Sequence, residues 1–352
     1  MNYHGGYHGE KKQIVDLSVN TNSFIDLSEE RGLLLSEWEK MTKYPEIEGE
    51  TAKNHIAAHH QIDANQLILG NGATEIIYLY AQQCKGKKVL LLSPTFSEYE
   101  RALALYGADI YKYDMSQNNF EYQWDSIMRY IKNVEIDILF ICNPNNPTGM
   151  LIQDQAWEGV LKELDQMGVQ LFVDESFIYF TEETGLLAYT SRYKIFVLRS
   201  ITKIFHIPGI RIGYGVGNKA MVEKMLKYKQ PWTLNALALL LAERYEIMLE
   251  KSESGVAKIA EERAFIEKSF QAWPQFKLFP GKANFFMVKG PKGFDVAELN
   301  VFLLEKGFFV RDCSSFRELN ERYFRFSVQA HDVNVAFMEL LEAYIAEHQW
   351  ED

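Results

Sequence analysis

The alternation of short apolar runs with amphipathic runs between about residues 67 and 217 constrains the fold of this chain more than any other feature. Apolar runs of about 4–8 residues between turn residues are typical of buried parallel strands, and runs with a period of 3.6 are typical of helices. Their alternation predicts an α/β fold with a mostly parallel sheet. The predicted strands are 67–69, 89–93, 110–113, 138–142, 171–174, 195–200 and 211–217, and helices are predicted at 97–106, opened by a Ser97/Glu100 capping box, and at 154–167.

The pattern changes after Pro231 to a long helical stretch from Thr233 to about Ala272, which we expect to bend or break near Gly255. Short elements follow at 285–289, 295–306, 308–311 and 323–328, with a closing helix from about 333. This order predicts a smaller α+β domain of residues 1–40 and 236–352 beside a large α/β domain of residues 41–235. A chain of 352 residues with 47% hydrophobic residues can bury the core that two such domains need.

Polar residues follow two of the predicted strands, at the edge where open α/β sheets bind ligands. The turn Asn143-Pro-Asn-Asn-Pro-Thr-Gly149 ends one strand and presents Asn146 at its carboxyl end. The next strand ends in Asp174. An aspartate there is often a helix cap, but it can also keep a pyridine nitrogen protonated, because a buried carboxylate favours a cationic partner.

Lys203 closes the run Ser200-Ile201-Thr202-Lys203 after another predicted strand, and Arg211 follows eight residues later. A lysine amine forms a Schiff base with an aldehyde, while small hydroxyls and an arginine bind a phosphate dianion. An aldehyde that carries a phosphate is pyridoxal phosphate, so the run predicts a site for this cofactor. A solvated lysine in a surface turn is the alternative for the motif taken alone.

The segment Leu69-Gly-Asn-Gly-Ala-Thr-Glu75 lies between a predicted strand and a predicted helix. Backbone N–H groups at the start of a helix bind phosphate, and glycines let the backbone come close. The segment also opens like a dinucleotide fingerprint, but Glu75 stands in place of the third glycine. A phosphate site is therefore favoured over a nucleotide dehydrogenase.

The asparagine, aspartate, hydroxyls, lysine and arginine follow one another along the chain as in the pyridoxal-phosphate-dependent aminotransferases. The resemblance to this family extends over nearly the whole chain. The resemblance implies an aspartate-aminotransferase-like α/β fold, the PLP fold type I. It implies a Schiff base between Lys203 and pyridoxal 5'-phosphate, Asp174 against the ring nitrogen, and Asn146 on the ring hydroxyl. The other residues that it implies around the cofactor are Ala73, Thr74, Ser200, Thr202 and Arg211 at the phosphate, Phe96 and Phe177 at the ring, and Tyr44 reaching the phosphate across a homodimer interface.

Two arginines of the predicted smaller domain are candidates for substrate binding. Arg325 lies mid-strand among aromatic residues, where a buried arginine is costly unless it is paired. It is either an edge-strand arginine that reaches solvent or a clamp on a substrate carboxylate. The resemblance favours the clamp and implies that Arg311 meets a phosphate of the substrate. It also implies substrate contacts for Asn20 and His4.

Within the family, the chain resembles the histidinol-phosphate aminotransferases and the threonine-phosphate decarboxylases of cobalamin synthesis. The decarboxylase branch is favoured by His4-Gly5-Gly6, by Ile207-Pro208-Gly209, by residues 231–237, and by Phe177, where aminotransferases usually have a tyrosine. The segment after His4 is shorter than in that branch, and Ser176 replaces an expected alanine, so the substrate side chain could differ. We expect decarboxylation of O-phospho-L-threonine or O-phospho-L-serine to an amino-alcohol phosphate, with a histidinol-phosphate or related class I/II aminotransferase as the alternative.

Composition argues against several other classes of protein. A net charge of −11 without a basic cluster disfavours nucleic acid as a partner. No apolar run approaches 18 residues and the amino terminus is polar, so neither membrane insertion nor export is expected, and the three separated cysteines fit reduced thiols in the cytoplasm. His55 and His59, like His4 and His8, lie four apart without Glu or Cys ligands, so no metal is expected. A transcription regulator with this fold would need an appended DNA-binding domain.

Overall fold

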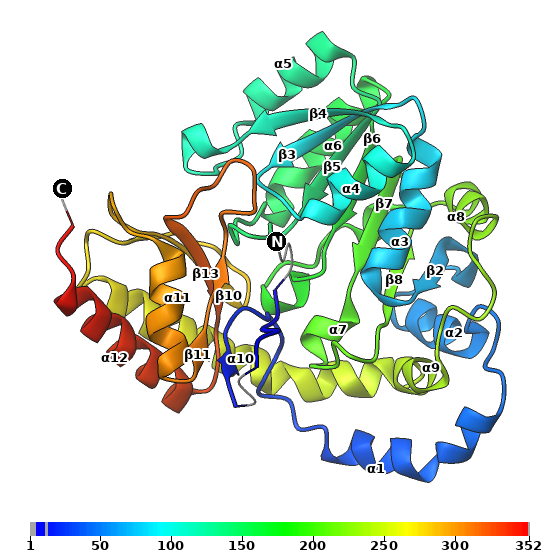
Figure 1. The fold of residues 1–352 in the computed structure, drawn as a ribbon. Helices are drawn as coiled ribbons and strands as arrows, with labels where there is room; N and C mark the ends of the chain where they lie inside the picture. The colour runs from blue at the N-terminus through cyan, green and yellow to red at the C-terminus, as the bar shows by residue number, and fades with distance from the viewer. Residues whose placement is uncertain (1–4, 11–12, 351–352) are drawn as a thin grey trace.

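The central sheet forms the middle layer of a large α/β unit (Figure 1). A computed structural model describes residues 5–10 and 13–350 of the chain, and in this part the sheet has seven strands in the order β2-β8-β7-β6-β5-β3-β4. β8 runs antiparallel to β2 and β7, whereas the other neighbours are parallel, so the predicted mostly parallel sheet is confirmed. The strands are β2 (Leu67–Gly70), β3 (Lys88–Ser93), β4 (Asp109–Asp114), β5 (Ile138–Cys142), β6 (Gln170–Asp174), β7 (Ile195–Arg199) and β8 (Gly213–Val216).

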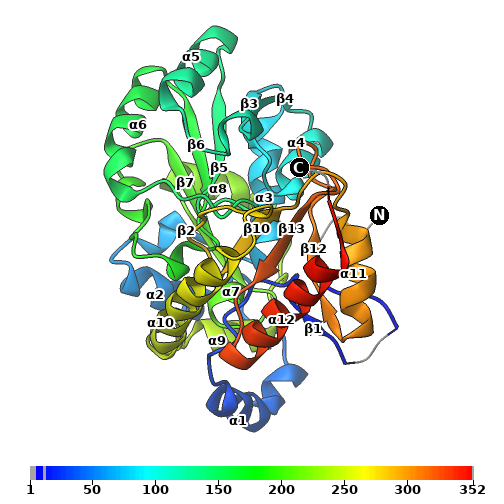
Figure 2. The same ribbon diagram turned by 90° about the vertical axis from the view of Figure 1, so that its left-hand side faces the viewer.

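Helices cover both faces of this sheet (Figure 2). Successive side chains of a strand point to opposite faces, and on β3 Leu90 and Leu92 enter one core while Val89 and Leu91 enter the other. A sheet buried on both faces needs strands that are apolar throughout, which explains the continuous apolar runs of the sequence. One face is covered by α3 (Gly72–Ala81), α4 (Ser97–Leu105) and α8 (Lys219–Leu226), and the other by α2 (Glu50–His59), α5 (Trp124–Val134) and α6 (Asp154–Gln166).

The carboxyl-terminal part of the chain forms a smaller α+β unit beside the large sheet (Figure 1). Its antiparallel sheet has the order β12-β13-β10-β9, and β1 in the amino-terminal part of the chain pairs with β11 of this unit. The domain boundaries at residues 40 and 235 stay a prediction. The strands are β1 (Val15–Asp16), β9 (Lys277–Leu278), β10 (Phe285–Lys289), β11 (Phe308–Phe309), β12 (Arg311–Asp312) and β13 (Tyr323–Ser327), and the helices are α10 (Tyr245–Phe270), α11 (Val296–Glu305) and α12 (His331–Glu347).

The remaining helices connect the two units or lie in loops. α1 (Ser28–Ser36) packs against α9 (Ala236–Ala242), and α7 (Ile201–Ile204) follows β7. Short 3-10 helices lie at Trp38–Thr42, Ala64–Gln66, Gln82–Cys84, Ser116–Asn118, Ile178–Phe180 and Leu187–Tyr189. Within residues 5–10 and 13–350, none of the helices combines the length and the apolar content that a bilayer crossing requires.

The break predicted in the long helical stretch was placed wrongly. The chain leaves helical structure at Glu243 and Arg244, between α9 and α10, whereas Gly255 lies inside α10. A Cβ atom on Gly255 would lie 2.6 Å from the side-chain oxygen of Asn22. The glycine therefore allows a close contact with the amino-terminal segment and does not end the helix.

The predicted capping box at the start of α4 was also wrong. Phe96 holds the cap position of this helix, and its side chain, which has no acceptor, makes no capping hydrogen bond. Glu100 instead accepts a hydrogen bond from Lys112 Nζ at 2.7 Å, in the neighbouring strand β4.

Candidate active site

A cavity of about 390 Å³ lies where the carboxyl ends of β5, β6 and β7 face β12 and β13. Tyr44 lies outside this cavity, with its ring on Trp232 and 85% of its surface exposed. His4 lies outside the described residues. The remaining predicted site residues all line the cavity: Asn20, Ala73, Thr74, Phe96, Asn146, Asp174, Phe177, Ser200, Thr202, Lys203, Arg211, Arg311 and Arg325.

Lys203 enters the cavity from α7, the short helix that follows β7. Burial lowers the pKa of its amine to about 8, and the positive charges of Arg325 and Arg211 act in the same direction. The negative charge of Asp174 opposes them. A lysine with a lowered pKa is neutral in a larger fraction of molecules near neutral pH, and the neutral amine is the nucleophile.

Asp174 is buried at the end of β6 and accepts two hydrogen bonds. Tyr99 Oη donates to Oδ2 at 2.7 Å and the Ser176 backbone N–H donates to Oδ1 at 2.8 Å. Burial raises the pKa of Asp174, although these hydrogen bonds favour its charged form. A cation beside the carboxylate would offset the cost of burying this charge, and a protonated pyridine nitrogen is such a cation.

The start of α3 forms one end of the cavity together with Arg211. Gly72 has φ +74°, and a Cβ atom there would lie 2.3 Å from Arg211 Nη2, so the guanidinium packs directly against the first turn of α3. Arg211 itself has φ +64°, in the left-handed region that a non-glycine residue rarely adopts. This conformation also explains why β8 begins at Gly213 and not at Arg211, as the sequence predicted.

Two hydroxyls complete this end of the cavity. Ser200 Oγ and Thr202 Oγ1 lie 2.8 Å apart and both side chains are buried. The first backbone N–H groups of a helix have no partner within the helix, and Ala73 and Thr74 of α3 line the same space. Unpaired N–H groups, hydroxyls and a guanidinium are the groups that bind a phosphate dianion.

Arg325 lies across the cavity, on β13, with its guanidinium held by polar groups of three residues on two other segments. Its Nη2 donates to the Ser18 carbonyl at 2.7 Å, and its Nη1 donates to Asn146 Oδ1. The amide of Asn20 faces the same guanidinium, with its oxygen 3.3 Å from Nε in the orientation that pairs donor with acceptor. Burial lowers the pKa of Arg325 to about 10, a value that still leaves it charged at neutral pH.

Arg311 stands directly opposite Arg325 on the neighbouring strand β12. Its Nη2 donates to Ser315 Oγ at 2.6 Å, and its guanidinium carbon lies 5.9 Å from the Phe316 ring centre. Opposite residues of an antiparallel pair share one face of the sheet, so both guanidinium groups line one wall of the cavity. This wall of the cavity therefore carries two positive charges that can bind anions.

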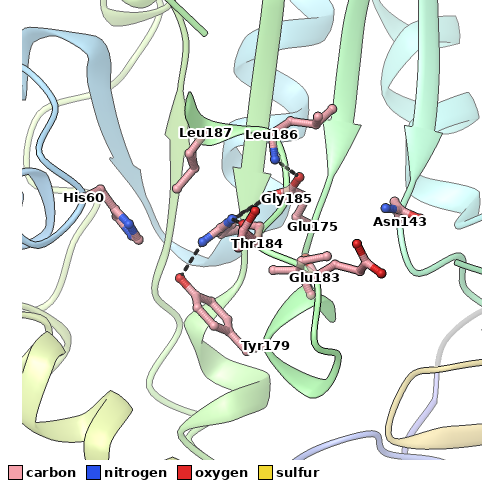
Figure 3. Close-up of polar contacts among 12 residues, drawn as sticks. His60, Asn143, Glu175, Tyr179, Glu183, Thr184, Gly185, Leu186 and Leu187 are labelled. Atoms are coloured by element: carbon pink, nitrogen blue, oxygen red, sulfur yellow. Dashed lines mark hydrogen bonds and ion pairs between the residues drawn. The ribbon is translucent and has the colours of Figure 1, made fainter. Parts of the chain in front are cut away.

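A buried polar cluster behind the cavity fixes the ends of β6 and β7 (Figure 3). The guanidinium of Arg199 donates to Glu175 Oε2 from Nε at 3.0 Å and from Nη2 at 2.8 Å, and its Nη1 donates to Tyr179 Oη at 3.0 Å. The other carboxylate oxygen of Glu175 accepts from the Leu186 N–H at 2.6 Å. Because Glu175 follows Asp174 and Arg199 precedes Ser200, this cluster positions two residues of the site.

Several residues of the cavity were missed in the sequence, among them Ser18, Glu98, Tyr99 and Cys142. Tyr99 is the most informative, because it donates to Asp174. Its spacing of three residues from Phe96 predicts a shared helix face, a signal that could have identified it. Ser18 gave no signal, because its place in the cavity depends on the pairing of β1 with β11.

The residues of the cavity fit pyridoxal phosphate. The start of α3, two hydroxyls and Arg211 would hold the phosphate, the buried carboxyl of Asp174 would receive the ring nitrogen, and Lys203 would receive the aldehyde carbon. Glycine at position 72 leaves the space in which Arg211 approaches the phosphate end. Within the described residues, no three His, Cys, Asp or Glu side chains gather as metal ligands would.

Comparison with known proteins agrees with this arrangement. Residues 12–340 match the family model "Aminotransferase class I and II". A threonine-phosphate decarboxylase of Salmonella typhimurium is 30% identical over 94% of this chain and 90% of its own length, and a histidinol-phosphate aminotransferase of Methanococcus aeolicus is 28% identical over 96% and 92%. The crystal structure of L-threonine-O-3-phosphate decarboxylase from Porphyromonas gingivalis superposes with a TM-score of 0.85 and 27% identity, over 94% of this chain and 99% of that one.

Proposed function

The chain belongs to the class I and II aminotransferase family, which depends on pyridoxal phosphate, and on this premise we propose that it is a decarboxylase of an O-phospho amino acid. The substrate is O-phospho-L-threonine or O-phospho-L-serine, and the product is an amino-alcohol phosphate. The single observation that carries this proposal is the pair Arg311 and Arg325 on one wall of the cavity that contains Lys203. Two neighbouring buried cations suit a small substrate with two anionic ends.

In this proposal the residues of the cavity divide between cofactor and substrate. Ala73, Thr74, Ser200, Thr202 and Arg211 hold the cofactor phosphate, Asp174 and Asn146 hold the ring nitrogen and hydroxyl, and Phe96 and Phe177 pack on the ring. When bound, pyridoxal phosphate supplies an electron sink for the bond that breaks at the substrate Cα. Arg325 and Asn20 bind the substrate carboxylate, and Arg311 binds the substrate phosphate, with His4 as a further predicted contact.

Orientation of the substrate decides which bond breaks, because only a bond perpendicular to the conjugated ring overlaps its π system. Arg325 anchors the carboxylate and so sets this angle. Phe177 supports decarboxylation, because it is buried in the cavity and brings no hydroxyl to the ring, where aminotransferases usually have a tyrosine. The Salmonella and Porphyromonas relatives named above support the same choice. The role of Lys203 at this step is to return a proton to Cα after CO2 leaves.

A product assay separates this proposal from the alternative, a histidinol-phosphate aminotransferase, which the Methanococcus relative supports. The enzyme is incubated with phosphothreonine and with phosphoserine, and separately with histidinol phosphate plus 2-oxoglutarate. CO2 and an amino-alcohol phosphate from either phospho amino acid are expected. Glutamate from histidinol phosphate, without CO2 from either phospho amino acid, would establish the aminotransferase instead.

The same family premise leads us to propose a homodimer. Leu35, Trp38 and Tyr44 are exposed by 64%, 60% and 85%, and they lie on one connected stretch of chain, α1 and the residues after it. The ring of Tyr44 packs at a tilt against Trp232, which is also exposed. Large exposed apolar side chains that gather in this way mark protein contacts. A second copy that covers this face would bring Tyr44 toward the cofactor phosphate of its partner.

A further inference from the structure

The amino-terminal segment from Gly5 to Tyr7 passes over the edge of the cavity beside Arg325, and Gly5 lines the cavity itself. We propose that Ser18 is a positioning residue that fastens this segment to Arg325 and so sets the affinity for the anionic substrate. This inference rests on the proposed function only for the identity of the substrate, because the contacts that carry it belong to the chain alone.

Ser18 is buried, and its polar groups contact three different partners. Its Oγ accepts a hydrogen bond from the Gly6 N–H at 2.7 Å and donates to Asp16 Oδ1 at 2.5 Å. Its carbonyl oxygen accepts from Arg325 Nη2 at 2.7 Å. One residue thus joins the amino-terminal segment, strand β1 and the arginine that faces the substrate.

Asp16 supplies the second attachment of the segment. Its Oδ2 accepts from the Tyr7 N–H at 2.8 Å, and its Oδ1 accepts from the Ser18 N–H at 2.9 Å as well as from the hydroxyl. Asp16 pairs with Phe309 across the β1 and β11 ladder, and the Tyr7 ring packs on the same Phe309 at a centroid distance of 5.3 Å. The segment is therefore held against the smaller unit, on the side that carries Arg311 and Arg325.

Gly5 shows how closely the segment passes. A Cβ atom there would lie 2.6 Å from the Ser18 carbonyl oxygen and 3.6 Å from Arg325 Nη2. A side chain at this position would push the segment away from the carbonyl that orients the guanidinium. The close approach makes Gly5 part of the wall of the arginine site, and it explains why the chain has a glycine here.

The physical consequence is a guanidinium with restricted rotation. Because the Ser18 carbonyl binds one Nη2 hydrogen, the other N–H groups keep a fixed direction, and a pre-oriented fork binds a carboxylate with a smaller loss of conformational entropy. The hydrogen bond from Gly6 and the close approach of Gly5 hold Ser18, and with it this carbonyl, in place. Loosening the segment should therefore let the carbonyl shift and weaken substrate binding, and it should leave the cofactor end of the cavity, at α3 and Arg211, unchanged.

The test compares Ser18→Ala, Gly5→Ala and the double variant in the full-length enzyme loaded with pyridoxal phosphate. Ser18→Ala keeps the carbonyl that binds Arg325 but loses both hydrogen bonds of the hydroxyl, from Gly6 and to Asp16. Ser269→Ala is the matched control, because it removes a serine hydroxyl that donates to the Phe265 carbonyl within α10, away from the cavity. Each variant is titrated with phosphothreonine, and binding is followed by calorimetry and by the cofactor absorbance. KM, kcat and cofactor affinity are then measured with the substrate that the wild type converts.

We expect each single variant to weaken phosphothreonine binding and to raise KM about threefold to tenfold, the size of one lost hydrogen bond. We expect kcat to change less than about twofold and cofactor affinity to stay unchanged, and the double variant to bind about as weakly as either single one, because both changes release the same segment. Unchanged substrate binding in Ser18→Ala, additive losses in the double variant, or a parallel loss of cofactor would overturn the inference. Failure of the wild type to decarboxylate contradicts the proposed function instead, and histidinol phosphate then replaces phosphothreonine in the same titrations.

Discussion

At the scale of single residues, the site depends on how burial changes the charge of each group. Lys203, Asp174, Arg311 and Arg325 all have pKa values shifted toward their neutral forms by desolvation. The chain has a net charge of −11, but it places four basic side chains in one cavity. They are Lys203, Arg211, Arg311 and Arg325. The excess of positive charge is local, and it is there that an anionic cofactor and an anionic substrate would bind.

The lowered pKa of Lys203 predicts how cofactor uptake depends on pH. Below about pH 8 the amine of the cofactor-free protein is mostly protonated and cannot attack an aldehyde, and above this pH it is mostly neutral. The rate at which pyridoxal phosphate binds covalently should therefore rise with pH and level off above about 8. Stopped-flow absorbance from pH 6 to 10 measures it. A rate that keeps rising toward pH 10.5 would mean that the cavity does not shift this lysine.

Removal of Arg311 or Arg325, which we propose to bind the substrate, should weaken transition-state binding by about 2–5 kcal/mol, because each charge is desolvated and a bound anion would lose its partner. We expect Arg311→Ala and Arg325→Ala to lower kcat/KM accordingly while cofactor affinity survives. Arg325→Lys is the matched control, since it keeps the charge without the planar fork and should recover only part of the loss. Steady-state kinetics with phosphothreonine measure the effect. If both alanine variants keep the wild-type kcat/KM, the substrate binds elsewhere.

At the scale of elements, the site is built from strand ends and one helix start. The carboxyl ends of β5, β6 and β7 place Asn146, Asp174 and Lys203, and the first turn of α3 faces Arg211. These parts could be predicted because each is local: an apolar run, a turn and a polar residue in fixed order. The role of Gly255 and the cap of α4 could not, because Gly255 makes room for Asn22 and Glu100 bonds Lys112 of β4, and both partners are distant from these residues in the sequence or lie on another element.

The pairing of segments that are distant in the chain could also not be predicted from the sequence. Ser18 reaches Arg325 only because β1 joins β11, and Tyr99 reaches Asp174 only because α4 packs over β6. Such contacts depend on how distant strands pair and how helices pack on them, which no local sequence pattern determines. The arginines were nevertheless found, because a buried charge in an aromatic strand is costly and therefore conspicuous.

The first turn of α3 gives a prediction at this scale. Gly72→Ala introduces a Cβ atom 2.3 Å from Arg211 Nη2 at φ +74°, so it displaces the guanidinium and strains the backbone by about 1–3 kcal/mol. Affinity for pyridoxal phosphate should fall by at least about tenfold. Gly159→Ala is the control, because this position lies inside α6 with open space around it and should gain up to about 1 kcal/mol of stability. Titration with the cofactor and thermal unfolding distinguish the two, and equal cofactor affinity in both would contradict this account of the phosphate end.

At the scale of the whole molecule, the cavity lies between two units that contain both ends of the chain. The large unit supplies Lys203, Asp174 and Arg211 and the small sheet supplies Arg311 and Arg325, so neither part could form the cavity alone. In the proposed dimer, the exposed face around Trp38 and Tyr44 would add a third contributor, a second copy of the chain.

The proposed dimer should have twice the mass of the 40.8 kDa chain in analytical ultracentrifugation. Trp38→Asp places a charge on the exposed apolar face and should shift the protein toward monomer, whereas Val301→Asp, a change at an apolar residue exposed by 63% on α11, should not. Cofactor affinity should fall together with dimer content if Tyr44 acts on the partner. A wild-type monomer with full cofactor affinity would rule out that role.

Every role proposed for the cavity depends on a covalent bond between Lys203 and pyridoxal phosphate. Borohydride reduction of the cofactor-loaded protein, followed by peptide mapping, detects this bond. We predict one reduced pyridoxyl group per chain, on Lys203, and none in Lys203→Ala. A label on another lysine, or no label at all, would contradict it.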